Sequence, residues 1–401
     1  MFHQFVPSFC VRTALMSGNL RTVCVVGGGI GGLVCAQSLL HLTKSAGINT
    51  RIVLLEKSPR LGGQIRTRHI LVNGSSVIIE EGAEGFVTRS EVFPRVASYA
   101  GMPSESIVDQ IRIADNELSY DIGSDKWFVK ALPPGLAAQK LGFQVPDRDR
   151  GRGIRSFRYG MGQFVRQIES NLPEVRMKSE VRSISVSDSP TAFKVGFCLD
   201  ETSSESELIA DAVVLGVPMH TLHNILKYPG LPEPPPPPGH NSHISVHLLV
   251  SRTHAATEPA SFTVPNDLQQ RFGGLRAVAL VNEKFPNRCP DDSWLFRFYY
   301  RPTHNHDPSH ADHWIGQATR TLDEIFGIRN PTASWFSPWL SILPIINRDH
   351  LEACRLWKDE VQRSTSGRVV VVGSEVAGAG LEAAAISGFD AASSIFARLT
   401  V

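Results

Sequence analysis

One stretch near the N-terminus limits the fold of this chain more than any other. It starts with a β-branched run, Val23–Val26, and a glycine-rich turn with the spacing G-x-G-x-x-G. The turn leads into an apolar segment of helical character, Leu33–Leu42, and a second apolar run, Ile52–Leu55, ends at Glu56. A strand, a glycine turn, a helix, a second strand and an acid in this order predict a βαβ unit that binds a dinucleotide.

Each glycine of this turn has its own physical role. Gly27 lets the chain turn sharply off the strand, Gly29 lets the backbone approach a pyrophosphate, and Gly32 lets the helix pack closely against the strand. The helix start at Ile30 and Gly31 offers free N–H groups and the positive end of the helix dipole to the phosphates. A purely structural glycine turn is the alternative interpretation of the same spacing.

The acid at the end of the second strand indicates which dinucleotide fits. Glu56 lies 24 residues past Gly32, where its carboxylate can accept hydrogen bonds from ribose hydroxyls. We include the neighbouring Lys57 in the predicted site. A carboxylate at this position would repel a 2′-phosphate, so the sequence disfavours NADP.

A second glycine pair follows the acid. Arg60, Gly62 and Gly63 complete the pattern E-x-x-x-R-x-G-G, which a nicotinamide-binding unit does not need. The pattern resembles the flavin-containing amine oxidase superfamily, where the arginine and glycines run along the diphosphate and flavin of FAD. The resemblance implies that FAD is the cofactor and that these three residues contact it, with a basic surface turn as the alternative. The superfamily's next arginine is replaced by Gln64, and its candidate substitutes are Arg66 and Arg68.

The composition is that of an ordinary globular protein. The chain has 401 residues, 42% of them hydrophobic and 20% charged, and 40 Lys plus Arg nearly balance 39 Asp plus Glu. This balance gives no overall field that would attract nucleic acid, and no apolar run approaches the length of a transmembrane helix. The six cysteines have no metal or disulfide spacing, so we expect a reducing compartment.

Residues 1–20 precede the first strand and contain no acid and one arginine, Arg12. We interpret them as a tail. A weak organelle transit peptide is one alternative, and an over-long start is another, because Met16 lies close to the fold. The expected location is the cytoplasm, or a mitochondrion or plastid if the segment is a transit peptide.

A second motif, E-x-G-x-x-x-F-x-x-R, follows the βαβ unit. Its residues are Glu80, Gly82, Phe86 and Arg89, and the spacing resembles the protoporphyrinogen oxidase branch of the superfamily. The resemblance implies that the segment from Gly82 to Phe86 lines the flavin face. Arg89 would anchor a substrate carboxylate, since a guanidinium matches a carboxylate bidentately. These residues are the catalytic candidates, and a surface arginine at a helix start is the alternative for Arg89.

The chain departs from that branch between the leucine-proline pair Leu132–Pro133 and the next motif, which begins at Tyr159. The oxidases carry a large helical insertion there, which supplies much of the substrate pocket and of the membrane-facing surface. Here only the charged, glycine-rich residues 145–157 bridge the gap. We therefore expect a shortened substrate or cap region, and a peripheral contact with a membrane stays open.

The middle of the chain predicts mainly strands. By the resemblance, Val181 in a strand over 177–184 lies against the adenine of FAD, although a core valine would look the same. Residues 208–218 are expected to form a single strand, and the polyproline stretch Pro232–Gly239 a stiff linker, with a ligand for an SH3-like partner as the alternative. Alternating runs predict an antiparallel sheet, the substrate-side floor. These runs are His243–Ser251, Leu275–Val281 and Trp294–Tyr300.

The last motif, Arg368–Ile395, again reads as a strand, a glycine turn and a helix. In the superfamily this unit closes on the flavin. A separation of more than 340 residues from the first motif fits a cofactor cleft built from both ends of the chain. A repeated glycine-rich turn is the alternative. The cofactor-site residues that the resemblance assigns here are Gly373, Ser374, Gly380 and Leu381.

Histidines gather in one polar loop. They are His304, His306, His310 and His313. No regular element is expected to fix their geometry, so we predict adventitious binding rather than a metal centre.

These observations predict an α/β fold, a Rossmann-like FAD-binding domain of the GR2 type with a second, antiparallel-sheet substrate domain. The FAD-binding parts are expected at residues 21–90, 161–230 and 363–401. The shortened cap region is expected at 91–160 and the substrate domain at 240–362.

The function implied by the resemblance is oxidation of a porphyrinogen by FAD and oxygen, which gives a porphyrin and hydrogen peroxide in haem biosynthesis. One alternative is an FAD-dependent amine oxidase or desaturase acting on another small molecule. Another is a non-catalytic FAD-binding remnant that serves a partner protein. No nucleic-acid partner is expected, and the sequence leaves the oligomeric state open.

Overall fold

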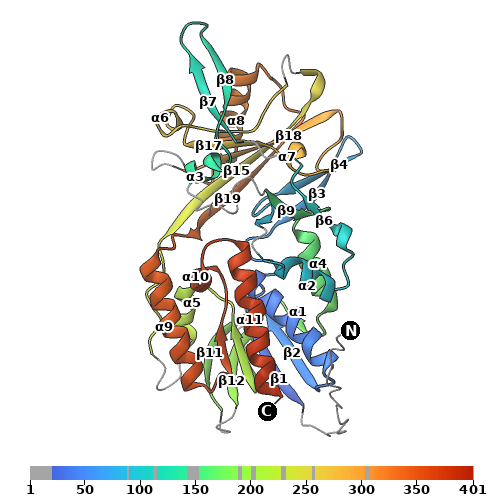
Figure 1. The fold of residues 1–401 in the computed structure, drawn as a ribbon, viewed down its shortest axis with the longest axis vertical. Helices are drawn as coiled ribbons and strands as arrows, with labels where there is room; N and C mark the ends of the chain where they lie inside the picture. The colour runs from blue at the N-terminus through green and yellow to red at the C-terminus, as the bar shows by residue number, and fades with distance from the viewer. Residues whose placement is uncertain are drawn as a thin grey trace, which may run out of the picture.

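The computed structural model describes residues 20–87, 90–111, 115–141, 153–187, 192–199, 205–226, 232–254, 258–302 and 307–400. In this part of the chain the elements gather into a lower and an upper lobe (Figure 1). The lower lobe holds a parallel sheet between two covering layers, and the upper lobe holds a large, mainly antiparallel sheet. The predicted combination of an α/β domain with a second, antiparallel-sheet domain is confirmed.

Five parallel strands form the main sheet of the lower lobe. In spatial order they are β10 (Val175–Arg176), β2 (Thr50–Leu55), β1 (Arg21–Val26), β14 (Ala212–Leu215) and β20 (Val369–Val371). The C-terminal halves of β1 and β2 and all of β14 and β20 are buried. Because both faces of a parallel sheet are covered, such strands have continuous apolar runs, and this explains the predicted strands at 23–26 and 52–55.

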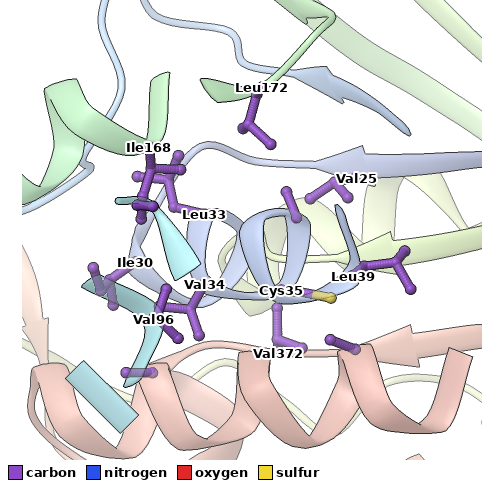
Figure 2. Close-up of a cluster of buried hydrophobic side chains, with 14 of the residues drawn as sticks. Val25, Ile30, Leu33, Val34, Cys35, Leu39, Val96, Ile168, Leu172 and Val372 are labelled. Carbon is purple, nitrogen blue, oxygen red and sulfur yellow. The ribbon is translucent and has the colours of Figure 1, made fainter. Parts of the chain in front are cut away.

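Helices cover one face of this sheet. They are α1 (Ile30–Ser45), α2 (Val92–Tyr99), α4 (Gly162–Asn171) and α11 (Leu381–Leu399). Figure 2 shows part of their shared core, in which Cys35 of α1 and Val372 lie between α1 and α11. The two long helices approach so closely that a Cβ added at Gly388 would lie 2.1 Å from the carbonyl oxygen of Gly31. Helix α11 therefore needs a glycine at this contact.

A three-stranded antiparallel sheet and two helices cover the other face. They are β11 (Ser179–Val186), β12 (Phe193–Leu199), β13 (Glu205–Ala210), α5 (Met219–Ile225) and α9 (Arg348–Ser364). The single strand predicted over 208–218 is wrong, since β13 and β14 belong to different sheets. Asp211 lies between them, and its carboxylate accepts the backbone N–H of Thr22 at 2.8 Å, which fixes the junction against β1.

Seven strands form the sheet of the upper lobe. In spatial order they are β19 (Ala333–Pro344), β15 (His240–Ser251), β18 (Ser293–Tyr300), β17 (Leu275–Leu280), β16 (Phe262–Thr263), β7 (Asn116–Asp121) and β8 (Lys126–Ala131). All neighbours are antiparallel except β16 and β7. The hairpin β7–β8 comes from the predicted cap region, which thus extends the upper sheet (Figure 1).

Alternation sorts the side chains of this sheet onto two faces. Ile244, Val246 and Leu248 of β15 pack in an apolar core with Trp314 of α8 (Ala311–Phe326). The intervening polar residues of β15 face the other way, and they are buried as well, with His247 only 1% exposed. The upper sheet is therefore covered on both faces in its centre, with an apolar face and a polar face.

Short elements connect the lobes. Figure 1 shows β3 (Thr67–Val72), β4 (Ser75–Glu80), β6 (Ile107–Asp109) and β9 (Ile154–Phe157) between the two large sheets. Strand β5 (Phe86–Val87) pairs with β9. The remaining short helices are α3 (Leu136–Lys140), α6 (Asn266–Gln269), α7 (Val281–Lys284) and α10 (Ser374–Ala377).

The polyproline stretch is fastened to the body of the protein. Pro232 accepts a hydrogen bond from the indole N–H of Trp357 at 3.0 Å, and the Gly239 carbonyl accepts the backbone N–H of Ile345 at 2.7 Å. The stretch joins α5 to β15, as expected of a linker, but it does so in contact with the protein. A partner that recognises polyproline would meet a backbone that is already partly bonded.

None of the helices in the described ranges is long and apolar enough to cross a membrane. The predicted tail at residues 1–19 and the charged residues 142–152 lie outside the described part of the chain. So do His304 and His306 of the histidine loop. Within the described ranges, no three His, Cys, Asp or Glu side chains lie together in a way that could hold a metal ion.

Candidate cofactor and substrate site

The glycine turn after β1 lies at the carboxyl edge of the parallel sheet. Gly27 has φ +100°, and a Cβ added there would lie 2.4 Å from the carbonyl oxygen of Gly216. A Cβ added at Gly32 would lie 2.1 Å from the Gly27 oxygen. Gly29 is different, because it has φ −70° and nothing lies within 4 Å of an added Cβ. The fold itself requires glycine at 27 and 32, whereas Gly29 borders open space at the start of α1.

The carboxylate predicted to receive a ribose lies beside this turn. Glu56 follows β2, and its Oε2 accepts the backbone N–H of Gly28 at 2.6 Å. Its Oε1 accepts the backbone N–H and the hydroxyl of Ser58, at 2.8 and 2.6 Å. Each carboxylate oxygen has two lone-pair sites, so Glu56 can still accept a bond from a ligand hydroxyl. The neighbouring Lys57 is exposed.

Arg60 shapes the second glycine loop. Its guanidinium donates to the carbonyl oxygens of Ile65 at 2.9 Å and Gly63 at 2.8 Å. Gly62 and Gly63 adopt positive φ, +102° and +55°, which bends the loop toward the first turn. A Cβ added at Gly63 would lie 3.3 Å from the Cα of Gly29. Arg60 was predicted to run along the ligand, and in this structure it holds the loop that lies beside Gly29.

Gln64 occupies the position of the arginine that follows the glycine pair in the superfamily, and Arg66 and Arg68 were its candidate substitutes. All three residues bind other partners in the structure. Gln64 donates from Nε2 to the carbonyl of Ile342 in β19, at 2.9 Å, and so joins the two lobes. Arg66 Nε and Arg68 Nη1 both pair with the carboxylate of Glu81, at 2.6 and 3.0 Å. Since the Glu81 side chain is only 4% exposed, both arginines are drawn to it rather than left for a ligand.

The C-terminal motif meets the N-terminal one at this edge. A Cβ added at Gly31 would lie 3.1 Å from the backbone nitrogen of Gly373. Gly373 and Gly380 have φ +120° and +102°, and nothing lies within 4 Å of a Cβ added at either. Ser374 begins α10 and Leu381 begins α11, which has 19 residues. Both chain ends therefore contribute open backbone to one edge of the sheet.

These features together fit a dinucleotide. Gly29 and Gly380 border open space at the N-termini of α1 and α11, where backbone N–H groups and the helix dipoles favour phosphate, and Gly373, which precedes the short α10, borders open space as well. The predicted adenine contact, Val181, is a core residue that is 6% exposed. Its strand is nevertheless close to Glu56, whose carbonyl accepts the backbone N–H of Ser179 at 2.8 Å.

The three catalytic candidates have different positions. A Cβ added at Gly82 would lie 1.9 Å from the carbonyl oxygen of Gln64 and 3.1 Å from the indole of Trp339, so Gly82 lies between the cofactor edge and the upper sheet. Phe86 is 2% exposed, and its ring stacks on Phe93 with centroids 4.2 Å apart. The structure thus gives Phe86 a packing role instead of an open face. Arg89 lies outside the described residues.

The polar face of the upper sheet lies next to Gly82. Its residues share one feature, a polar or aromatic side chain at alternate positions of three paired strands, and sequence analysis missed all of them except the two tryptophans, which would line the pocket of an amine oxidase. They are Trp335, Ser337 and Trp339 of β19, His243, Ser245 and His247 of β15, and Arg297 and Tyr299 of β18. The sequence signals were present, since three polar residues alternate in HISVH and one charge interrupts the apolar run WLFRFYY.

A charged cluster lies against this face. Glu84 pairs with Arg297, Nη1 to Oε2 at 3.4 Å, and with Lys284 of α7 through a short contact. Burial alone would raise the pKa of Glu84, but Lys284 and Arg297 outweigh burial and lower this pKa to about 2. Burial and the charge of Arg297 lower the pKa of His243 to about 3. At neutral pH the face therefore carries ionised Glu84 beside neutral imidazoles.

The fold and the site are those of a two-domain protein of the dinucleotide-binding class. The glycine-lined edge of its parallel sheet lies next to the polar face of the upper sheet. Residues 122–396 match the family described as flavin containing amine oxidoreductase, and residues 25–100 match the NAD(P)-binding Rossmann-like domain. The first match spans more than half of the chain. The chain belongs to the flavin-containing amine oxidoreductase family.

Individual relatives resemble the chain to different extents. A coproporphyrinogen III oxidase of Mycobacterium tuberculosis (strain ATCC 25618 / H37Rv) is 37% identical over 87 residues, which is 22% of this chain and 18% of that relative. The matched region thus spans less than a fifth of the relative's length. A solved structure from Exiguobacterium sp. 255-15, provisionally assigned as a protoporphyrinogen oxidase, has a TM-score of 0.72 at 17% identity over 94% of this chain and 99% of that one. Cyclohexylamine oxidase from Brevibacterium oxydans IH-35A has a TM-score of 0.68 at 12% identity over 95% and 100%. At these identities the structural likeness concerns the fold.

Proposed function

We propose that this chain binds FAD and oxidises a porphyrinogen with oxygen, which gives a porphyrin and hydrogen peroxide. The observation that carries the proposal is the glycine-lined edge, where Gly29 and Gly380 leave open space at the N-termini of α1 and α11 and Gly373 leaves open space before α10. The substrate class is supported by the names of the mycobacterial relative and of the Exiguobacterium structure. Such a step would belong to haem biosynthesis.

FAD would be held mainly by backbone. The N–H groups at the start of α1 and α11 would bind its diphosphate, and Glu56 would accept hydrogen bonds from its ribose. Arg60 would keep the loop at Gly62 and Gly63 in the shape that admits the cofactor. When bound, the flavin would supply the redox chemistry, as acceptor of hydride equivalents from the substrate and donor of electrons to oxygen.

The substrate would lie between this edge and the polar sheet face. Trp339, which packs against Gly82, would exclude water there. His243 is half-buried, and its low pKa keeps it neutral at pH 7, so it offers a hydrogen-bond acceptor to a substrate N–H group. Arg89 would bind a carboxylate of the substrate. Replacing Arg89 with Ala should therefore raise KM more than it lowers kcat, and the opposite pattern would contradict this role.

The direct test uses the purified protein in air. Protoporphyrinogen and coproporphyrinogen are added separately, and porphyrin fluorescence and hydrogen peroxide are followed against a protein-free sample that corrects for spontaneous oxidation. We expect both signals to grow with enzyme concentration for at least one substrate. A flavin-loaded protein that accelerates neither reaction would contradict the substrate assignment and leave flavin binding intact.

A second candidate is oxidation of an amine. The observation that favours it is the pair Trp335 and Trp339, two half-buried indoles on the polar face, of which Trp339 lies against Gly82. Aromatic faces attract cationic amines. Under this alternative, amines such as cyclohexylamine or putrescine should bleach the flavin absorbance in the absence of oxygen, while the porphyrinogens should not.

The cysteines support a reducing compartment such as the cytoplasm for either reaction. Those that the structure describes are all free thiols.

A further inference from the structure

We propose that Arg297 and Trp339 of the upper sheet are positioning residues that hold the Glu81–Gly82 peptide at the end of the cofactor edge. Through this peptide the upper lobe would set the shape of the site that the lower lobe builds. The inference rests on the proposed function, since a bound flavin is the group that this peptide would meet. It assigns a role to side chains that neither the motifs nor the relatives indicate.

A continuous line of backbone contacts leads from the glycine turn to this peptide. Gly63 lies against Gly29, as an added Cβ at 3.3 Å from the Gly29 Cα indicates. The next residue, Gln64, presents its carbonyl oxygen to Gly82, where an added Cβ would be 1.9 Å away. The same oxygen accepts the backbone N–H of Ala83 at 3.3 Å. A ligand extended along the edge from Gly29 past Gly63 therefore ends beside Gly82.

Two side chains of the upper sheet donate to the carbonyl oxygens of Glu81 and Gly82. Arg297 Nη2 donates to the Gly82 oxygen at 2.7 Å and to the Glu81 oxygen at 3.4 Å. Trp339 Nε1 donates to the Glu81 oxygen at 2.6 Å. These two residues lie on β18 and β19, and β15 lies between these strands. The peptide is thus held from two points of one rigid sheet.

Arg297 itself has little freedom to move. It is 2% exposed, its Nε donates to the Ser245 hydroxyl at 2.8 Å, and its Nη1 pairs with Glu84. Its guanidinium lies over the ring of Tyr299, 4.7 Å from the centroid. Glu84 in turn pairs with Lys284. All three nitrogens of the guanidinium have partners, so this group is held in place and fixes the position of the Gly82 carbonyl.

The lower lobe holds the same peptide from the other side. The backbone N–H of Glu81 donates to the Arg66 carbonyl at 2.8 Å, and the Glu81 carboxylate pairs with Arg66 and Arg68. The peptide therefore bonds to both lobes, and a change in either should reach it. Arg66 and Arg68 pair with Glu81, and Lys284 and Arg297 pair with Glu84. Glu80 and Arg288 add one further acidic and one further basic group, so basic groups stay in excess, which favours negative charge on a neighbouring ligand.

A second buried arginine of the same charged region provides a matched control, because Glu80 and Glu84 act on it as well. Arg288 is 0% exposed, and it donates to the Ser156 hydroxyl at 2.9 Å and the Phe157 carbonyl at 3.1 Å. It does not touch the Glu81–Gly82 carbonyls. If Arg297 only stabilises the fold, loss of either arginine should have the same consequences. If Arg297 positions the peptide, only its loss should alter the cofactor edge.

The experiment compares Arg297→Gln, Arg297→Lys, Trp339→Phe and Arg288→Gln with the wild-type full chain. Hydrogen–deuterium exchange is measured over residues 81–86, and the visible circular dichroism of bound FAD is recorded after loading. We expect Arg297→Gln to speed exchange in this segment about tenfold and to change the flavin spectrum. Arg297→Lys keeps a cation at this position, and Trp339→Phe leaves the two bonds from Arg297 in place, so both should show smaller changes of the same kind. Arg288→Gln should lower thermal stability without either change.

Unchanged exchange over residues 81–86 in Arg297→Gln and Trp339→Phe would overturn the proposal. An equal spectral change in Arg288→Gln would also overturn it, because the effect would then be general. If Arg297→Gln does not fold, the exchange rates of Arg297→Lys and Trp339→Phe test the proposal instead. If the wild-type protein binds no flavin, the proposed function fails, while the exchange measurement still decides whether Arg297 and Trp339 hold the peptide.

Discussion

Two regions of this protein meet at Gly82 and work by different means. At the glycine-lined edge of the parallel sheet the candidate site is mainly backbone, and within the described residues Gly29, Gly373 and Gly380 leave open space there. On the polar face of the upper sheet the side chains make the site, and they come from strands far apart in the sequence. Ligand binding at the glycine-lined edge would depend on space that no side chain fills. The polar face depends on charged groups and hydrogen-bond donors that each have a partner.

The contrast predicts different responses to mutation. In the glycine edge a substitution should act through steric clash or through lost ligand space, depending on what lies beside the position. On the polar face a substitution should act through a charge or donor that loses its partner inside the protein. The following variants separate these mechanisms.

The largest effect is expected for Glu84→Gln. This change leaves Lys284 and Arg297 without their shared carboxylate in a buried setting. Breaking a buried ion pair from one side costs about 3–5 kcal/mol. Chemical denaturation at pH 7 should show a loss of unfolding free energy in this range, and a loss below about 1 kcal/mol would contradict the importance of the pair.

The same carboxylate predicts a pH dependence. The pKa of Glu84 falls from an ordinary 4.5 to about 2 in the folded protein. A group whose pKa is lowered by folding stabilises the protein above its unfolded pKa, and the contribution, about 3 kcal/mol, is lost as the pH falls from about 4.5 toward about 2. The difference in unfolding free energy between the wild type and Glu84→Gln should therefore shrink over this interval. A difference that does not depend on pH there would contradict the assignment.

Two glycine variants separate an effect on the stability of the fold from an effect on ligand binding. In Gly32→Ala the new Cβ would meet the Gly27 carbonyl at 2.1 Å, so the backbone must shift and we expect a loss of about 1–3 kcal/mol or more. In Gly29→Ala the new Cβ meets nothing within 4 Å at an ordinary φ of −70°, so stability should stay within about 0.5 kcal/mol of the wild type while FAD binds more weakly. Thermal unfolding and FAD titration of both variants check this. Equal effects on stability would contradict it.

A smaller effect than that of Gly32→Ala is expected for Trp339→Phe. An aromatic ring is kept, while the N–H that donates to the Glu81 carbonyl is lost with part of the indole, and the lost hydrogen bond costs about 1 kcal/mol. Arg355→Ala is a surface control, because its two ion pairs with Glu352 and Asp359 involve half-exposed side chains. Only the tryptophan variant should alter the spectrum of bound FAD. A spectral change in the surface variant would show that the readout is not specific.

The sequence predicted the glycine edge well because its physics is local. The spacing of Gly27, Gly29 and Gly32 determines a turn, a close contact and an open position within a few residues. The alternation in His243–Ser251 likewise predicted an antiparallel strand, and β15 covers this run.

The polar face could not be predicted to the same depth, because its contacts join distant residues. Glu84 and Lys284 are 200 positions apart, and no local pattern indicates that they pair. Phe86 was expected to line the flavin face, but the burial of a phenylalanine depends on the partners Phe93 and Phe157, which only the fold brings together. The break at Asp211 was missed for the same reason, since it depends on a contact with Thr22.

The central claim is that both chain ends build one FAD site at the glycine-lined edge. The most direct measurement is a titration of flavin-free protein with FAD, followed by flavin fluorescence, for the wild type, Gly29→Ala and Gly380→Ala. We predict one FAD per chain for the wild type and weaker binding by both variants, although the two glycines belong to opposite ends of the sequence. Binding that neither substitution weakens, or no binding of FAD by folded wild-type protein, would contradict the claim.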